Sequence, residues 1–351
     1  MPFSNHIKEV YSMNRIVVAG CGSMANTWVQ YTLERSDCQI VGLADVNTAA
    51  AEDMARRYNL SCPIFSGVQE AAEAVKPNLV YDITPPDFHC SVSSAAMRAG
   101  CDVMSEKPIS NDAEQAKALV RTAEETGRFY ALMQNRRYLS GIQDMRAFLT
   151  TNQLGKPGML CADFFIGAHF DGFRKVMDNP LLLDMSVHTF DMARFLLGAD
   201  AVSVYCHAFN PAGSWYEGDA SAICTFEMSN GSIFSYRGSW SAEGHFTSWE
   251  SDWRIQCEKG TIIWDGNDKM SARIAAPSDP SQFMYDSREL EIPRAYSGRT
   301  GHYGCLDAMF DAYNNHRPAE TCGKNNLNSV MMCLAAARSA KEGRKVLLSE
   351  M

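Results

Sequence analysis

The chain has 351 residues, about twice the length of a typical domain, so we expect two domains with a core large enough to fold unaided. Hydrophobic residues make up 46%, charged residues 21% and aromatic residues 10%, which excludes a disordered, collagen-like or coiled-coil chain. The net charge of −9 argues against nucleic acid as a partner, because an acidic surface repels phosphate backbones.

Cysteine usage and the uncharged stretches bear on the compartment. The twelve cysteines are dispersed and form no C-x-x-C pair, which favours a reducing compartment, so we expect a cytoplasmic protein. The longest uncharged stretch, from Ile16 to Leu33, carries Gly, Ser, Asn, Thr and Gln, so no membrane span is expected. The N-terminus has no apolar export segment, and residues 1–13 are interpreted as a short tail.

The first half alternates strand-like and helix-like segments. Apolar runs predict strands at 15–19, 39–44, 79–83, 102–105 and 129–133. Helix-like segments lie at 24–33, 48–58, 90–98 and 112–125. Strict alternation predicts a doubly wound parallel sheet with helices on both faces. We assign this α/β domain to residues 14–135.

The pattern changes near Asn135 and becomes β-rich. Helices are predicted at 140–150, about 181–197 and about 326–342, and β-type segments at 159–166, 202–209, 220–228, 232–240, 250–257 and 261–264. Turn signals at 228–232 and 258–260 require antiparallel neighbours. Residues 266–300, rich in Ser, Pro, Asp and Arg, read as a long loop. We therefore expect residues 136–351 to form an open-faced, mainly antiparallel sheet with flanking helices.

A glycine loop follows the first predicted strand and opens a helix. Its G-x-G-x-x-A spacing gives a tight turn at the first glycine, close backbone approach to a pyrophosphate at the second, and close helix–strand packing at the alanine. The helix N-terminus offers N–H groups to the phosphates. The predicted dinucleotide contacts in this loop are Gly20, Gly22, Ser23, Met24 and Ala25.

Asp45 ends the second predicted strand, 20 residues after Ala25. A carboxylate there can accept hydrogen bonds from the adenosine ribose hydroxyls. A 2′-phosphate would face like charge, and the following Asn47 and Thr48 supply no arginine. We therefore expect NAD as the cofactor rather than NADP.

Lys107 follows the fourth predicted strand, at the end where open α/β sheets place ligands. An ammonium at this position can hydrogen-bond a substrate hydroxyl and stabilise a developing alkoxide. The preceding Glu106 either holds ribose hydroxyls, orients Lys107 or is a plain surface carboxylate.

Asp184, His188 and Asp191 are spaced i, i+4 and i+7, so a continuous helix would place them on one face. We interpret His188 as the general base that takes a hydroxyl proton, and Asp184 as the acceptor that positions a neighbouring substrate hydroxyl. Asp191 either tunes or orients His188, caps a local group or contacts the substrate. A core histidine satisfied by hydrogen bonds is the alternative. No metal site is expected, because three or four ligands do not converge.

These segments together resemble a known family. GCGSMA at 20–25, Asp45, ITPPDFH at 83–89, SEKPIS at 105–110 and DMSVHTFDMARFLLG at 184–198 are similar in order and spacing to the glucose-fructose oxidoreductase and inositol dehydrogenase (Gfo/Idh/MocA) family. The resemblance runs from about residue 14 to the closing GRKVLL. It implies a Rossmann domain, then an open-sheet domain for substrate binding and oligomerisation, with the active site between them.

The resemblance also implies roles for single residues. Lys107 would touch both the nicotinamide ribose and the substrate, and the bond to Pro108 is often cis in the family. The turn with Thr84 and Pro85 would lie under the adenine and ribose. Asp184 and His188 occupy the positions of the family's substrate-positioning carboxylate and general base.

Further candidates lie in the second half. Arg137 could reach the nicotinamide amide or the substrate, or form an interdomain salt bridge. Polyols are bound by bidentate hydrogen bonds and aromatic faces, so His169, Arg174 and Tyr303 are candidates for substrate binding. A large sheet with one uncovered face is a liability, so we expect a homodimer or homotetramer through the open sheet.

We therefore predict an NAD-dependent dehydrogenase that acts on a secondary hydroxyl of a sugar, inositol or related polyol. Two alternatives stay open: a non-catalytic NAD- or sugar-binding regulator on the same fold, and a redox-neutral glycosidase that oxidises and re-reduces its bound NAD. The sequence does not name the substrate, because a one-residue error in strand register turns every side chain to the opposite face.

Overall fold

The computed structural model describes residues 13–351, so the predicted tail lies outside the described residues except for Met13. The described chain divides into two compact units. Unit 1 comprises residues 13–110, 115–133 and 307–323, and unit 2 comprises residues 111–114, 134–306 and 324–351. The division differs from a single boundary after residue 135, because residues 307–323 belong to unit 1.

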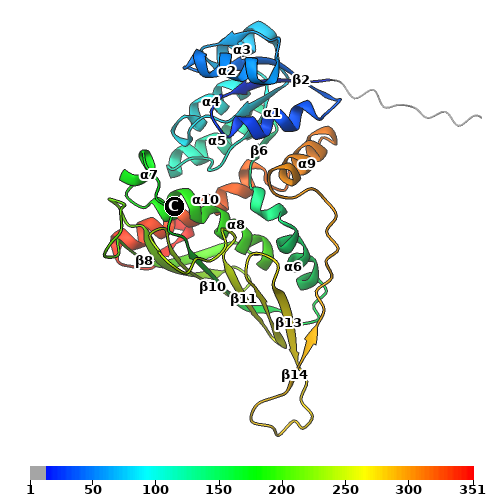
Figure 1. Ribbon diagram of the computed structural model, residues 1–351, viewed down its shortest axis with the longest axis vertical. Helices are drawn as coiled ribbons and strands as arrows, with labels where there is room; N and C mark the ends of the chain where they lie inside the picture. Colours follow the sequence, from blue (N-terminus) through cyan, green and yellow to red (C-terminus); the bar gives the residue numbers. More distant parts are fainter. Residues whose placement is uncertain (1–12) are drawn as a thin grey trace, which may run out of the picture. The chain divides into compact units, whose positions relative to one another are not determined.

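Unit 1 is built on a six-stranded sheet in the order β3-β2-β1-β4-β5-β6. Figure 1 labels β2 and β6 of this sheet, with the helices α1 to α5 beside it. Neighbouring strands pair in parallel throughout, so the carboxyl ends of all six strands lie along one edge. The strand order reverses at β1 and β4, which is where sheets of this kind bind ligands. The strands are β1 (Asn14–Ala19), β2 (Cys38–Ala44), β3 (Ile64–Phe65), β4 (Leu79–Asp82), β5 (Asp102–Ser105) and β6 (Tyr130–Leu132).

The helices of unit 1 alternate with these strands as far as β6, with α9 added later in the chain, and the predicted doubly wound α/β sheet is confirmed. They are α1 (Ala25–Leu33), α2 (Thr48–Tyr58), α3 (Val68–Val75), α4 (Pro86–Arg98), α5 (Ala113–Thr126), whose first residues fall in unit 2, and the later part of α9 (Gly301–Asn314). The sequence pattern did not reveal β3, α3 or α9. Two residues are too few to show a strand pattern, and α3 has only eight residues.

Unit 2 is built on a nine-stranded sheet in the order β14-β13-β12-β11-β7-β10-β9-β8-β15. All neighbours pair antiparallel except β7 and β10, so the predicted mainly antiparallel open sheet is confirmed. The strands are β7 (Pro157–Phe165), β8 (Ala201–Phe209), β9 (Ser221–Met228), β10 (Ile233–Ser239), β11 (Asp252–Cys257), β12 (Gly260–Trp264), β13 (Met270–Ala275), β14 (Ser287–Leu290) and β15 (Val346–Leu347).

The predicted loop at 266–300 is wrong in part, because it contains β13 and β14. These two strands lie at the end of the sheet, and most of their side chains are exposed. Both strands are short and lie within a segment rich in Ser, Pro, Asp and Arg, so the segment resembles a loop. Both predicted hairpins are confirmed, since β9 pairs antiparallel with β10 and β11 with β12.

One face of the nine-stranded sheet packs on helices, and the alternation along β9 shows this clearly. Ala222, Cys224 and Phe226 are buried, whereas the intervening residues are exposed. Phe190 of α8 contacts the rings of Phe226, Phe234 and Tyr236 on this face, with centroids 4.9 to 5.7 Å apart. The helices of unit 2 are α6 (Ser140–Thr150), α7 (Phe173–Val176), α8 (Ser186–Leu197), the start of α9, and α10 (Gly323–Glu342), whose first residue belongs to unit 1.

The predicted helix at 181–197 differs in detail from the observed one. Residues Leu181–Met185 form a π-helical turn, and α8 begins at Ser186. Asp184 therefore lies in the π turn and His188 in the first turn of α8. The simple i, i+4 geometry of a continuous α-helix does not hold between them, because a π turn takes more residues than an α turn.

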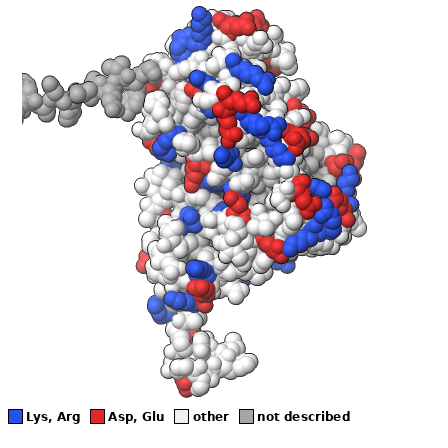
Figure 2. Space-filling view, turned by 180° about the vertical axis from the view of Figure 1, so that it is seen from behind, with Lys and Arg blue, Asp and Glu red and all other residues white. Residues whose placement is uncertain are grey.

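The described surface is mixed in charge. Figure 2 shows Lys and Arg side chains interspersed with Asp and Glu side chains on the face that it presents. None of the helices within residues 13–351 is long and apolar enough to cross a membrane.

Candidate active site

The glycine loop begins where β1 ends, and the backbone conformation at its first position requires a glycine. Gly20 has φ +90°, and a Cβ there would lie 2.6 Å from the carbonyl carbon of Ile83. Gly22 has no atom within 4 Å of where a Cβ would be, so the backbone there is open to an approaching group. The loop therefore packs tightly on the end of β4 and leaves open space beside its second glycine.

The start of α1 suits an anion. No side chain caps this end, and no acidic residue lies in the first turn of α1. The positive end of the helix dipole is therefore available to a phosphate group. Together with the open space at Gly22, these features fit the pyrophosphate of a dinucleotide.

Asp45 follows β2 and is tied to the glycine loop. Its Oδ2 accepts the Cys21 backbone N–H at 2.8 Å, and its Oδ1 accepts the Asn47 N–H at 2.8 Å. A carboxylate has about four acceptor positions, so each oxygen retains capacity for a ribose hydroxyl. Burial, together with the Asp45 charge, raises the pKa of the Cys21 thiol to about 12. The Cys21 thiol thus stays protonated near neutral pH and is no nucleophile.

The turn between β4 and α4 holds a buried carboxylate. Asp82 accepts the Thr84 hydroxyl at 2.5 Å and the Ser93 hydroxyl at 2.6 Å. The two ring nitrogens of His89 lie 2.7 Å from the carbonyl oxygens of Thr84 and Pro108. His89 therefore joins this turn to the segment after β5. Pro85 precedes the first residue of α4.

Glu106 and Lys107 come directly after β5. Glu106 is buried, and its Oε1 accepts the indole N–H of Trp28 at 2.8 Å. Its Oε2 accepts the backbone N–H of Lys107 at 3.2 Å. The bond between Lys107 and Pro108 is cis, and Lys107 is half-buried. Glu106 is thus not a plain surface carboxylate.

In unit 2, Asp184 is held by an arginine from the short helix α7. Arg174 donates its Nε–H to Asp184 Oδ2 at 2.6 Å. The guanidinium carbon lies 5.1 Å from the Phe170 ring centroid and 4.6 Å from that of Phe173. The aromatic faces and the carboxylate together fix the arginine, and the arginine fixes the orientation of the Asp184 carboxylate.

His188 and Asp191 are both buried on α8. Asp191 accepts a bidentate pair from Arg137, at 2.6 and 3.0 Å, and the Ser329 hydroxyl at 2.8 Å. Arg137 and Asp191 thus form a buried ion pair within unit 2. A buried carboxylate requires such donors, because an unpaired charge there would be costly. The cofactor role of Arg137 and the substrate role of Asp191 stay predictions.

The remaining candidates of unit 2 lie on loops and on α9. The His169 ring stacks on Trp215 with centroids 3.6 Å apart, and its Nε2 lies 2.6 Å from Glu243 Oε1. Tyr303 of α9 lies under the Arg299 guanidinium, 5.0 Å from the ring centroid. Their roles toward a substrate also stay predictions.

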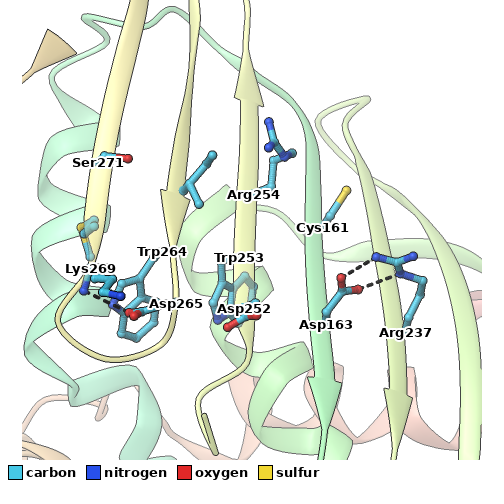
Figure 3. A pocket seen from close by; sticks show the side chains of 12 residues that line it. Cys161, Asp163, Arg237, Asp252, Trp253, Arg254, Trp264, Asp265, Lys269 and Ser271 are labelled. Carbon is cyan, nitrogen blue, oxygen red and sulfur yellow. Dashed lines mark hydrogen bonds and ion pairs between the residues drawn. The ribbon is translucent and has the colours of Figure 1, made fainter. Parts of the chain in front are cut away.

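A cavity of about 560 Å³ lies on the exposed face of the nine-stranded sheet (Figure 3). Side chains from β7 and β10–β13 line it, among them the ion pair of Asp163 and Arg237. None of the predicted site residues lines this cavity. Within residues 13–351, no cluster of three or more His, Cys, Asp or Glu side chains is placed to hold a metal ion.

The structure brings the predicted residues of unit 1 to one edge of its sheet. The glycine loop, Asp45, Thr84 and Lys107 each follow the carboxyl end of a parallel strand. Trp28 was missed by the sequence analysis. It lies 78 positions from Glu106, and a tryptophan in an apolar helix reads only as core.

Comparisons with known proteins identify the family. Residues 14–134 match the model described as oxidoreductase family, NAD-binding Rossmann fold. Residues 142–263 match the GFO/IDH/MocA C-terminal domain. The chain belongs to the Gfo/Idh/MocA oxidoreductase family.

Named relatives and solved structures extend along most of the chain. The inositol 2-dehydrogenase of Rhizobium meliloti is 28% identical over 350 residues, covering 95% of this chain and 99% of that protein. The D-glucoside 3-dehydrogenase of Escherichia coli is 28% identical over 239 residues, covering 62% of this chain and 68% of that protein. An Agrobacterium radiobacter oxidoreductase, solved with NAD+, L-tartaric acid and magnesium, is 19% identical with a TM-score of 0.84 and covers 97% of this chain and 100% of its own; this shows the shared fold.

The two glycines of the loop allow a matched test. Gly20→Ala should lower the free energy of unfolding by about 2–4 kcal/mol, because of its positive φ and the contact with Ile83. Gly22→Ala should leave the unfolding free energy of the ligand-free protein unchanged but weaken NADH binding about tenfold or more. Urea denaturation and NADH fluorescence titration measure the two quantities. Unchanged NADH affinity in Gly22→Ala would contradict the assigned loop.

Proposed function

We propose that this chain is an NAD-dependent dehydrogenase that oxidises a secondary hydroxyl of a sugar, inositol or related polyol. The observation that carries the proposal is the shared edge of the parallel sheet. A glycine loop suited to a pyrophosphate and the Glu106-Lys107 pair both follow carboxyl ends of strands in this sheet. A lysine beside a bound dinucleotide is a group that can act on a hydroxyl undergoing oxidation.

The cofactor would be held by unit 1. The backbone of residues 20–25 and the start of α1 would take the pyrophosphate, and Asp45 the adenosine ribose hydroxyls. Thr84 and Pro85 would contact the adenine and ribose, and Glu106 a ribose hydroxyl. The cofactor, when bound, supplies the acceptor for the hydride.

Lys107 would donate a hydrogen bond to the substrate oxygen that loses its proton. Its ammonium stabilises negative charge on that oxygen, and the stabilisation grows as the alkoxide develops. The Glu106 carboxylate, which accepts the Lys107 backbone N–H, limits the movement of the lysine backbone.

His188 would remove the hydroxyl proton as a general base, and Asp184 would accept a hydrogen bond from a neighbouring hydroxyl. The ion pair with Arg174 supports the second role, because it fixes the carboxylate before the substrate binds. Arg174 and His169 would contact further substrate hydroxyls, as would Tyr303. Arg137 would act at the nicotinamide amide.

The substrate class rests on the relatives. One is named inositol 2-dehydrogenase and another D-glucoside 3-dehydrogenase. Both names describe oxidation of a ring hydroxyl that has neighbouring hydroxyls. We propose the same class for this chain, and a reducing cytoplasm as its compartment, since all twelve cysteines are free thiols.

The catalytic assignment is tested by Lys107→Ala and His188→Ala, assayed for NADH formation with a panel of sugars, inositols and sugar acids. We expect kcat/KM to fall about 10²–10³-fold in the first and about 10²–10⁴-fold in the second, with NADH affinity retained. Lys76→Ala and His316→Asn, at exposed positions of unit 1, are the controls and should keep full activity.

Each other outcome has a distinct meaning. Full activity in either catalytic variant removes that residue from the proposed mechanism. NADH binding without oxidation of any polyol points to the regulator. Cleavage of a nitrophenyl glycoside without net NADH formation points to the redox-neutral glycosidase.

The proposed preference for NAD is tested at Asp45. Asp45→Asn removes the charge that would repel a 2′-phosphate, so the ratio of NADPH to NADH dissociation constants should fall about tenfold. Asp53→Asn, an exposed carboxylate on α2, is the control. Fluorescence titration with both cofactors measures the ratio. Tighter binding of NADPH than of NADH by the unmodified protein would refute the role of Asp45.

We also propose that the uncovered sheet face joins copies of this chain into a dimer or tetramer. Tyr205, Ile223 and Ile263 are 51%, 48% and 44% exposed on this face. The nine strands are two to nine residues long. At about 3.4 Å per residue and about 4.8 Å between strands they give a face on the order of 900 Å², close to what one partner buries in a standard interface.

The assembly is tested by light scattering. The unmodified protein should have at least twice the chain mass of 38.9 kDa at micromolar concentration, and Ile223→Arg should shift it toward the monomer. Glu73→Lys, an exposed change on α3, should leave the mass unchanged. A monomeric unmodified protein would contradict this proposal without touching the catalytic one.

A further inference from the structure

We infer that Trp28 is a positioning residue for the reaction: its indole N–H holds the Glu106 carboxylate, and through it the Lys107 backbone, in fixed relation to helix α1. The inference rests on the proposed function, because it concerns how the cofactor helix and the catalytic lysine are joined. Trp28 itself would touch neither substrate nor cofactor.

Two hydrogen bonds link Trp28 to Lys107 through the Glu106 carboxylate, and we call this arrangement the Trp28 link. The fully buried Trp28 donates to Oε1 at 2.8 Å, and the Lys107 N–H donates to Oε2 at 3.2 Å. An ionised carboxylate only accepts hydrogen bonds, and when buried it adopts the orientation in which donors reach both oxygens. The indole of α1 therefore decides how Glu106 is turned.

The Trp28 side chain is itself held in place by its neighbours. Its ring packs on Tyr81 of β4 with centroids 4.8 Å apart. The Thr32 hydroxyl donates to the Trp28 carbonyl at 2.8 Å and lies 3.0 Å from the Tyr81 hydroxyl. The Thr32 hydroxyl also orients Tyr81, and a fully buried indole packed against that ring keeps one rotamer in a close-packed core. The donor thus has a fixed direction, as a positioning group requires.

The Trp28 link connects the two ends of the proposed cofactor site within unit 1. Trp28 lies three residues after Ala25, on the helix whose start would take the pyrophosphate. Glu106 and Lys107 follow β5, where the ribose and the reacting hydroxyl would lie. A shift of α1 relative to β5 would change the distance between the pyrophosphate site and Lys107. A misplacement of about 1 Å can lower a rate a hundredfold.

A core-filling role alone would not need the indole nitrogen, because a phenylalanine fills most of the same space. Trp28→Phe keeps a ring against Tyr81 and removes the donor to Glu106. Tyr81→Phe is the matched control: it alters the same cluster and removes one hydroxyl hydrogen bond, but leaves the Trp28 donor in place. Glu106→Ala, alone and combined with Trp28→Phe, completes a double-mutant cycle.

We expect Trp28→Phe to raise the NADH dissociation constant about fivefold and to lower kcat about tenfold with a polyol that the unmodified protein oxidises. Tyr81→Phe should change each by less than twofold. In the Glu106→Ala background, Trp28→Phe should have no further effect, because its action passes through that carboxylate. NADH titration gives the dissociation constant, and steady-state assays give kcat. Thermal unfolding is measured separately.

Equal effects of Trp28→Phe and Tyr81→Phe, or additive effects of Trp28→Phe and Glu106→Ala on NADH affinity, would overturn the inference. If the unmodified protein binds NADH but oxidises no polyol, the proposed function fails. The double-mutant cycle in NADH affinity still tests whether Trp28 acts through Glu106. The two failures are therefore distinguishable.

Discussion

Parallel pairing of the six strands in unit 1 is the constraint on which its candidate site depends. Parallel pairing places every carboxyl end at one edge, so loops far apart in sequence meet there. The contact of Gly20 with Ile83 and the hydrogen bond from Cys21 to Asp45 both follow from this arrangement. An antiparallel sheet would scatter the same loops over two edges.

Buried carboxylates are the second common feature, and each one has donors of its own. Asp82 has hydroxyls, Glu106 has an indole and a backbone N–H, and Asp184 and Asp191 have arginines. Burying an ionised carboxylate is costly unless donors reach it, so each donor set also fixes an orientation. In this protein, the donors that make burial of a carboxylate possible therefore also position it.

Much of the fold could be predicted because its signals are local. The alternation of apolar runs and helical segments predicted the parallel sheet, and Gly-containing turns predicted the two hairpins of unit 2. β3 is too short to show a pattern, and β13 and β14 are short strands within a segment rich in Ser, Pro, Asp and Arg. The π turn before α8 also carries no sequence signature. Its effect is to take Asp184 off the regular helix that carries His188.

The sequence by itself determined the glycine loop, Asp45, the Glu106-Lys107 pair and the family to which the chain belongs. These features rest on residue type and spacing along a continuous segment. Only the tertiary structure decided which donor each buried carboxylate receives: Trp28 for Glu106, Arg174 for Asp184 and Arg137 for Asp191. The physical reason is that hydrogen bonds depend on distance and direction in space, and the packing of strands and helices sets both for residues far apart in sequence.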